Sequence, residues 1–147
     1  MTAPYFYTNH FHNAEQSNEL DAIVGALFSV DDCASAYSTI RQWPAYQATS
    51  LIRMTDIAAA AGVNKVYYKD ESSRFGLGSF KALGGSYAIE CLSQDLSGGD
   101  LVVCTATDGN HGRAVAWGAG LCGAECHVFL HANVSEARAQ AIASLGA

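Results

Sequence analysis

Residues 101–145 read LVVCTATDGNHGRAVAWGAGLCGAECHVFLHANVSEARAQAIASL, and in this stretch short apolar runs alternate with helical patterns. The runs 101–105 and 125–130 are typical of buried strands, whereas the apolar spacing over 111–120 and 135–145 predicts helices. A strand, a helix, a strand and a helix in this order place the two strands in parallel, joined by a right-handed crossover. The stretch therefore predicts an α/β fold.

The sequence before residue 101 predicts four more elements. They are a helix over 30–40, a short helix over 55–62, a strand over 65–69 and a helix over 81–94. Ser29 and Thr55 are the expected caps of the first two helices, as Ser135 is of the last helix in the chain. Gly62 is the expected stop of the short helix. The pair Gly84–Gly85 predicts close packing at that point, because each glycine in a helix costs up to about 1 kcal/mol relative to alanine.

The composition limits the partners that the chain can have. It has 147 residues, half of them hydrophobic, which is enough for one ordinary domain. Its formal net charge of −6 disfavours nucleic acid and anionic membranes, because phosphate binding needs clustered cations. No basic start followed by an apolar run marks a secretory signal, and no run of roughly 20 apolar residues could span a bilayer. We therefore expect a cytoplasmic protein that binds a small molecule.

The five cysteines are an odd number, and several of them lie inside apolar runs. This arrangement favours reduced, buried thiols over a disulfide framework. Cys122, Cys126 and His127 are a weak zinc signal, because three residues separate the two cysteines and no second pair follows. The remaining histidines lack a spacing that would bring their rings together, so we expect no metal site.

Lys81 ends the segment KDESSRFGLGSFK, residues 69–81, where a loop of small residues leads into a helix. A nucleophilic lysine needs desolvation or a positive potential that favours its neutral form. The first turn of a helix, at the positive end of the helix dipole and behind Gly76, Gly78 and Ser79, supplies such surroundings. Taken alone, the segment fits a solvated surface lysine better. A second motif changes the balance toward an imine-forming lysine.

This second motif is TDGNHGR, residues 107–113, where the first strand of the α/β stretch gives way to a helix. Gly109 and Gly112 let the backbone turn tightly and approach a ligand. The free N–H groups in the first turn of a helix favour an anion such as a carboxylate, and ligands collect at the carboxyl ends of parallel strands. A plain Asp-Gly turn with Asn110 as a helix cap is the alternative. Together, however, the two motifs indicate a bound cofactor.

Neither glycine motif for nucleotides is present, because the Gly-Lys-Ser/Thr triplet and the dinucleotide spacing are both missing. Instead, Lys-Asp-Glu at 69–71 followed by Ser-Phe-Lys at 79–81 resembles the fold-type II pyridoxal-phosphate enzymes, which include the tryptophan synthase β subunit and the serine and threonine dehydratases. Within them, RFGLGSFKALGG at 74–85 and ATDGNHGR at 106–113 are most similar to the diaminopropionate ammonia-lyases. The dehydratases usually carry a hydroxyl residue or glycine where this chain has Asp108.

The resemblance implies pyridoxal phosphate as the cofactor and assigns roles to the motif residues. Lys81 would hold the cofactor as an imine and move the α-proton, Asn110 would hydrogen-bond its phenolic oxygen, and Phe80 would pack near it. Asp108 would be the second base, on the face opposite Lys81, so that D- and L-substrates could both be deprotonated. The substrate carboxylate would bind the turn of Thr107, Asp108, Gly109, Asn110 and His111.

The implied reaction is α,β-elimination of ammonia from 2,3-diaminopropionate, which gives pyruvate and ammonia. The implied fold is a three-layer, doubly wound sheet of the tryptophan synthase β-like type, incomplete in this chain. Residues 1–50 would be an N-terminal arm and a helix of the large domain, and residues 51–147 most of the small α/β domain, truncated at its C-terminus. The full-length protein would be a homodimer, and this fragment alone inactive. A serine/threonine dehydratase-like lyase and a noncatalytic truncated binding module are the alternatives.

Overall fold

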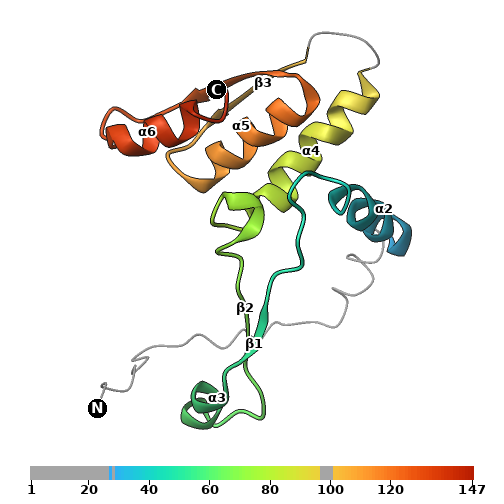
Figure 1. Cartoon of the computed structure of the whole chain (residues 1–147), viewed down its shortest axis with the longest axis vertical. Coiled ribbons are helices and arrows are strands. Elements are labelled where there is room, and N and C mark those ends of the chain that lie inside the picture. The colour runs from blue at the N-terminus through green and yellow to red at the C-terminus, as the bar shows by residue number, and fades with distance from the viewer. Residues whose placement is uncertain (1–26, 28, 97–100) are drawn as a thin grey trace.

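The computed structural model describes residue 27, residues 29–96 and residues 101–147 (Figure 1). Its elements are α2 (Val30–Ile40), β1 (Leu51–Arg53), α3 (Thr55–Ala61), β2 (Tyr67–Lys69), the 3-10 helix η1 (Arg74–Gly76), α4 (Lys81–Asp95), β3 (Val102–Ala106), α5 (Asn110–Cys122), β4 (Glu125–Phe129) and α6 (Glu136–Ala143). The arm expected at the start of the chain lies outside the described residues.

Strands β3 and β4 form a two-stranded parallel sheet, which confirms the pairing predicted from the sequence. The register runs from Val102 opposite Glu125 to Ala106 opposite Phe129, and α5 connects the two strands. Buried side chains of α4, α5, β4 and α6 form the main core: Ile89, Val115, Ala116, Ala119, Cys126 and Ile142. The sheet and its covering helices are thus one packed α/β unit.

Helices α4 and α5 pack side by side and run in the same direction (Figure 1). A Cβ atom on Gly85 would lie 3.5 Å from Ala114 Cβ, which is an ordinary contact, and one on Gly84 would meet nothing within 4 Å. On Gly118, by contrast, it would lie 2.6 Å from Ser86 Cα. The prediction of close packing at Gly84–Gly85 therefore holds only for Gly85, which α5 contacts, and the tighter approach lies one residue further on, where Ser86 meets Gly118.

Strands β1 and β2 form a separate antiparallel sheet, with Leu51 opposite Lys69 and Arg53 opposite Tyr67. The sequence did not indicate β1, because a strand of three residues is too short to show an alternating pattern. Figure 1 shows β1, α3 and β2 extending away from α4 and α5. Large apolar side chains on this group are exposed: Leu51, Ile52, Ile57, Tyr67 and Tyr68.

The helix ends test four predictions from the sequence. Ser29 caps α2 in a reciprocal capping box, in which its hydroxyl accepts from the Asp32 N–H and the Asp32 carboxylate accepts from the Ser29 N–H. Thr55 was predicted wrongly, since it is the first helical residue of α3 and Met54 occupies the cap position. Ser135 has the expected place before α6, but its side chain makes no capping hydrogen bond. Gly62 ends α3 in the left-handed conformation, as predicted.

All five cysteines are unpaired thiols. Cys126 is buried, and this burial raises the pKa of its thiol. Cys33 and Cys104 are exposed, so the expected burial of several thiols holds fully for Cys126 alone. Within the described ranges, no helix has both the length and the apolar character that a membrane span requires.

Candidate active site

Lys81 is the first residue of α4, as the sequence predicted, and its side chain is exposed. The loop before it turns through Gly76 and Gly78, which have φ values of 71° and 72°. Such values suit glycine because it has no Cβ atom. The backbone N–H of Lys81 donates to Ser79 Oγ at 3.3 Å, and its amine lies 5.0 Å from the ring centroid of Phe80. The amine thus stands beside an exposed aromatic ring, at the open end of a helix.

The chain has three lysines, and the structure gives them different surroundings. Lys69 Nζ donates to the carbonyl of Thr49 at 2.5 Å, and Lys65 lies exposed between α3 and β2. Lys81 is the lysine that stands at a helix start behind a glycine loop. Its amine therefore lies near the start of α4 and forms no ion pair with a carboxylate in the described part of the chain.

The second motif forms the connection from β3 to α5. Gly109 occupies the cap position of α5, and Asn110 is the first helical residue, so Asn110 is not the cap itself. Gly112 lies in a tightly packed place, because a Cβ there would lie 3.0 Å from Thr107 Cγ2 and 3.1 Å from Ile142 Cδ1. The motif therefore presents a free first helical turn on a tightly packed base.

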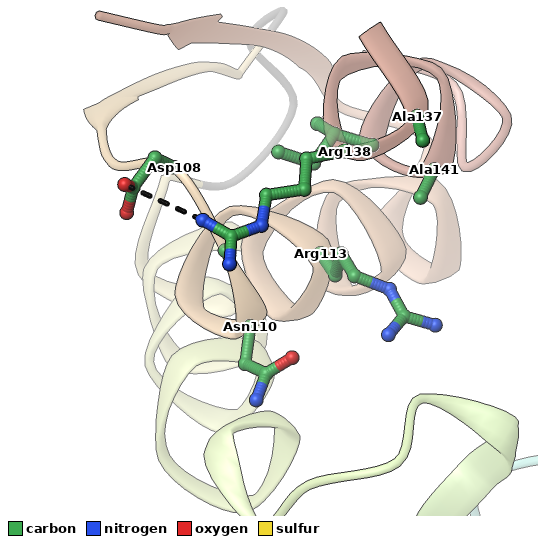
Figure 2. A pocket seen from close by; sticks show the side chains of 8 residues that line it. Asp108, Asn110, Arg113, Ala137, Arg138 and Ala141 are labelled. Carbon is green, nitrogen blue, oxygen red and sulfur yellow. Dashed lines mark ion pairs between the residues drawn. The ribbon is translucent and has the colours of Figure 1, made fainter. Parts of the chain in front are cut away.

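An open hollow of about 430 Å³ lies between this turn and α6 (Figure 2). It is lined by Asp108, Gly109, Asn110, Arg113, Ala137, Arg138, Ala141 and Ile142. Asp108 and Arg138 face each other at its rim, with 3.9 Å between Arg138 Nη1 and Asp108 Oδ2 and about two thirds of each side chain exposed. In Figure 2 the Asn110 amide is directed away from Arg138. The hollow thus combines a helix start with a carboxylate and a guanidinium.

The topology brings the two sequence motifs together at one end of the helix pair. A Cβ on Gly85, four residues after Lys81, would lie 3.9 Å from the imidazole of His111 in the first turn of α5. Because α4 and α5 run in the same direction, their first residues, Lys81 and Asn110, begin side by side.

Thr107 and Asp108 also line a second hollow, with His131. Lys81 and Phe80 line neither of these two hollows.

Arg113 and Arg138 are residues of the hollow that the sequence did not indicate. Arg138 follows Ser135 and Glu136 in the first turn of a helix, where a single sequence suggests only a solvated face. The Nε atom of Arg113 is buried without a hydrogen-bond partner among the described residues. Across those same residues, no three His, Cys, Asp or Glu side chains gather in a way that could hold a metal ion.

An ion pair with a buried guanidinium lies just before the two glycine turns that lead to Lys81. Arg74 is 6% exposed, and its Nε donates to Glu71 Oε2 at 2.7 Å. The guanidinium also donates to the other Glu71 oxygen, to Thr49 Oγ1 and to the carbonyl of Gln47, each at 2.9 Å. Hydrogen bonds from Arg74 and Thr49 lower the pKa of Glu71 to about 2. Every hydrogen-bonding nitrogen of the guanidinium therefore has an oxygen partner.

An aromatic cluster connects this loop to α5. Phe75 stacks on Trp117 with 4.8 Å between ring centroids, and Trp43 lies 5.7 Å from Phe75 and 5.6 Å from Trp117. The indole N–H of Trp43 donates to the Glu90 carboxylate at 2.5 Å. Phe75 thus holds the loop before α4 against α5, the helix that begins with Asn110.

Comparison with known proteins decides the family. The family model described as pyridoxal-phosphate dependent enzyme matches residues 43–147, which include both motifs. The chain belongs to this family. Diaminopropionate ammonia-lyase of Escherichia coli K12 is 36% identical over 155 residues, an alignment that covers 95% of this chain and 37% of that enzyme. The Salmonella typhimurium LT2 enzyme is 37% identical over 127 residues, with 73% of this chain and 31% of that enzyme covered.

Solved structures agree with this assignment to the pyridoxal-phosphate dependent enzymes. The Escherichia coli diaminopropionate ammonia-lyase in complex with an aminoacrylate-PLP azomethine reaction intermediate matches 82% of this chain and 33% of its own, with a TM-score of 0.71 and 36% identity. A pyridoxal 5'-phosphate-dependent aspartate racemase matches with a TM-score of 0.70 and 28% identity, over 80% of this chain and 36% of its own. The chain spans only about a third of the length of these curated relatives, 37% of the Escherichia coli enzyme and 31% of the Salmonella typhimurium enzyme.

The residues at the two helix starts fit pyridoxal phosphate. An aldehyde needs an accessible amine, which Lys81 offers, and a planar ring needs an apolar surface, which the 57% exposed side chain of Phe80 provides. The exposed amide of Asn110 can donate to an oxygen on the ring. These three side chains therefore match what the amine side of a cofactor site requires.

Proposed function

We propose that these residues belong to a diaminopropionate ammonia-lyase that uses pyridoxal phosphate. The single observation that carries the proposal is the pairing of α4 and α5, which starts Lys81 and Asn110 side by side at one end of the helix pair. The similarity to diaminopropionate ammonia-lyases over 95% of the chain supports the choice of substrate. Asp108 supports it too, because its carboxylate can act as a second base, besides the Lys81 amine, near the same helix start.

The residues at the two helix starts share the tasks of this proposal. When bound, the cofactor supplies an aldehyde for a lysine amine and a ring that withdraws electrons from the substrate Cα. Asn110 orients the ring by donating its amide N–H to a ring oxygen, and Phe80 covers the ring. The free N–H groups of the first turn of α5, from Gly109 to His111, bind the substrate carboxylate. A substrate held this way presents its Cα proton to the bases on either side.

Two bases move protons in the proposed reaction. The Lys81 amine takes the α-proton from one enantiomer of 2,3-diaminopropionate, and the Asp108 carboxylate takes it from the other. Loss of the β-amino group then leaves an enamine, whose hydrolysis gives pyruvate and a second ammonia. Arg138 lies within ion-pair distance of Asp108, the carboxylate that accepts this proton.

Lysine labelling in the full-length protein tests the proposal. With pyridoxal phosphate and borohydride, we expect reduced cofactor on Lys81, mapped by mass spectrometry, and ammonia release from diaminopropionate. Lys81→Ala should lose all but a slow background label on exposed lysines such as Lys65 and should lower turnover by about 10³-fold, because both attachment and proton transfer depend on this amine. The matched control is Lys65→Ala, which should retain both.

Two outcomes would overturn the proposal. One is a Lys81→Ala protein that still takes up the label elsewhere and still releases ammonia at the wild-type rate. The other is a wild-type protein that releases ammonia faster from L-serine or L-threonine than from either enantiomer of diaminopropionate, which would move the substrate to the dehydratases.

A further inference from the structure

The buried guanidinium of Arg74 is unusual among the charged groups of this chain. Besides Arg74, the buried polar side chains in the described ranges are the neutral Thr49 and Ser86. A buried guanidinium is stable only when oxygens replace the water that it has lost, and Arg74 has four such contacts between 2.7 and 2.9 Å. A guanidinium that makes all of its hydrogen bonds fixes the relative positions of the chain segments that supply the acceptors.

The partners of Arg74 come from both sides of the group formed by β1, α3 and β2. Gln47 and Thr49 precede β1, whereas Glu71 follows β2. The Thr49 hydroxyl also donates to Glu71 Oε1 at 2.5 Å, so the three side chains form a closed ring of hydrogen bonds. Arg74 therefore joins the segment before β1 to the segment after β2, just before the loop that leads to Lys81.

The residues after Arg74 connect the anchored guanidinium to the start of α4. Phe75 has a φ of 50°, which is unfavourable for a bulky residue and persists only where neighbours fix the backbone on both sides. One side is fixed by the Arg74 contacts and the other by the ring stack on Trp117. Leu77, 4% exposed, then packs with Ala82 at the start of α4. Six residues thus connect the guanidinium to Lys81, and two of them are anchored.

We infer that Arg74 is a positioning residue for Lys81, acting through Glu71, Thr49 and the strained turn at Phe75. The inference rests on the proposed function, since it concerns the lysine that holds the cofactor. Arg74 touches neither the cofactor nor the substrate in this assignment. It sets where α4 begins, and a displacement of about 1 Å in a reacting group can cost about 100-fold in rate.

The test uses Arg74→Lys in the full-length protein, because lysine keeps the positive charge but loses the planar fork that binds two oxygens at once. At a temperature well below unfolding, we expect the rate of borohydride-trapped labelling at Lys81 to fall by about 10- to 100-fold, with labelling at Lys65 unchanged. We expect kcat to fall by a similar factor while KM for diaminopropionate stays within about threefold. Arg41→Lys is the matched control, because Arg41 is an exposed guanidinium over the Tyr37 ring.

A purely structural role would lower the unfolding temperature and leave the Lys81 to Lys65 labelling ratio and kcat unchanged, and this result would overturn the inference. If Arg74→Lys does not fold, Thr49→Val decides, since it removes one hydroxyl partner and leaves the guanidinium in place. It should lower the Lys81 labelling rate by about fivefold, as the loss of one hydrogen bond predicts, and an unchanged rate would again overturn the inference. A wild-type protein without label at Lys81 would instead refute the proposed function, and the inference with it.

Discussion

The two sheets of this chain are held in place by different forces. The unit of α4, β3, α5, β4 and α6 has a continuous apolar core and a backbone contact between two helices. The group of β1, α3 and β2 buries only Ala58 among its own residues, and its base is held by the hydrogen bonds of Arg74. Nonpolar packing thus positions Asn110. Lys81 depends both on packing and on the hydrogen-bonded cluster of Arg74, Glu71 and Thr49, the polar lock. The comparison predicts that mutations in the two regions lower the free energy of unfolding by different amounts and with different pH dependence.

The largest effect is expected where the helix backbones meet. Gly118→Ala places a Cβ 2.6 Å from Ser86 Cα, and α4 must move away from α5 because that neighbour is backbone. The free energy of unfolding should fall by more than about 3 kcal/mol, at the upper end of overpacking costs. The measurement is a urea titration of the variant beside Gly120→Ala, whose new Cβ lies at an ordinary 3.9 Å from Leu145 O. Equal stabilities of the two variants would show that the helices do not meet at Gly118.

A smaller, pH-dependent effect is expected at the polar lock. Glu71 has an ordinary pKa near 4.5 that the fold lowers to about 2, so its stabilisation is complete above pH 4.5 and is lost as the pH falls toward 2. Glu71→Gln should cost about 2 to 3 kcal/mol at pH 7, and the difference from wild type should shrink between pH 4.5 and pH 2. Urea titrations across this range measure it. The control, Glu125→Gln, removes an exposed pair with His127 and should cost less than about 0.5 kcal/mol.

A difference between wild type and Glu71→Gln that stays constant from pH 7 to pH 2 would contradict the lock. In that case Arg74 would be held by the carbonyl of Gln47 and by packing rather than by the carboxylate.

The smallest effect is expected in α3. Ile57 is 50% exposed, so Ile57→Ser removes little buried surface and should change the unfolding free energy of the 147-residue chain by less than about 0.5 kcal/mol. Ala58→Ser, at the one buried position of the group, is the comparison variant and should cost more. A loss above about 1.5 kcal/mol for Ile57→Ser would show that α3 is covered in solution, and the contrast between the two regions would disappear.

Several features of the fold could be predicted because their signals are local. The apolar runs and helical spacing over residues 101–145 were sufficient for the parallel pair of β3 and β4, and the Ser29 cap followed from a serine placed before early acids and apolar residues at helical spacing. The positions of Lys81 and Asn110 at helix starts followed from the glycine-containing turns before them. Their proximity then followed from topology, because consecutive α/β elements place their helix starts at one edge of the sheet.

The rest could not be predicted because it depends on how distant segments meet. Any of the small residues in α4 and α5 could have marked the crossing, and only the packed structure selects Gly118. Arg74 lies in a polar stretch that suggests exposure. Its burial requires Glu71 and Thr49 to converge from either side of the β1–β2 pair, of which β1 was not predicted. The ion pair of Asp108 with Arg138 likewise joins two helix starts whose separation the sequence does not encode.

The sheet of β3 and β4 has a consequence for handling the chain. Each strand has its partner on one side, and among the described residues the opposite edge of each has no hydrogen-bonded neighbour. Unpaired edges of parallel strands act as templates for any extended segment, and Val102 and Phe129 add exposed apolar surface at 53% and 66%. At high concentration the 147 residues alone should therefore self-associate edge to edge, and a lysine or proline introduced at an edge is the natural remedy.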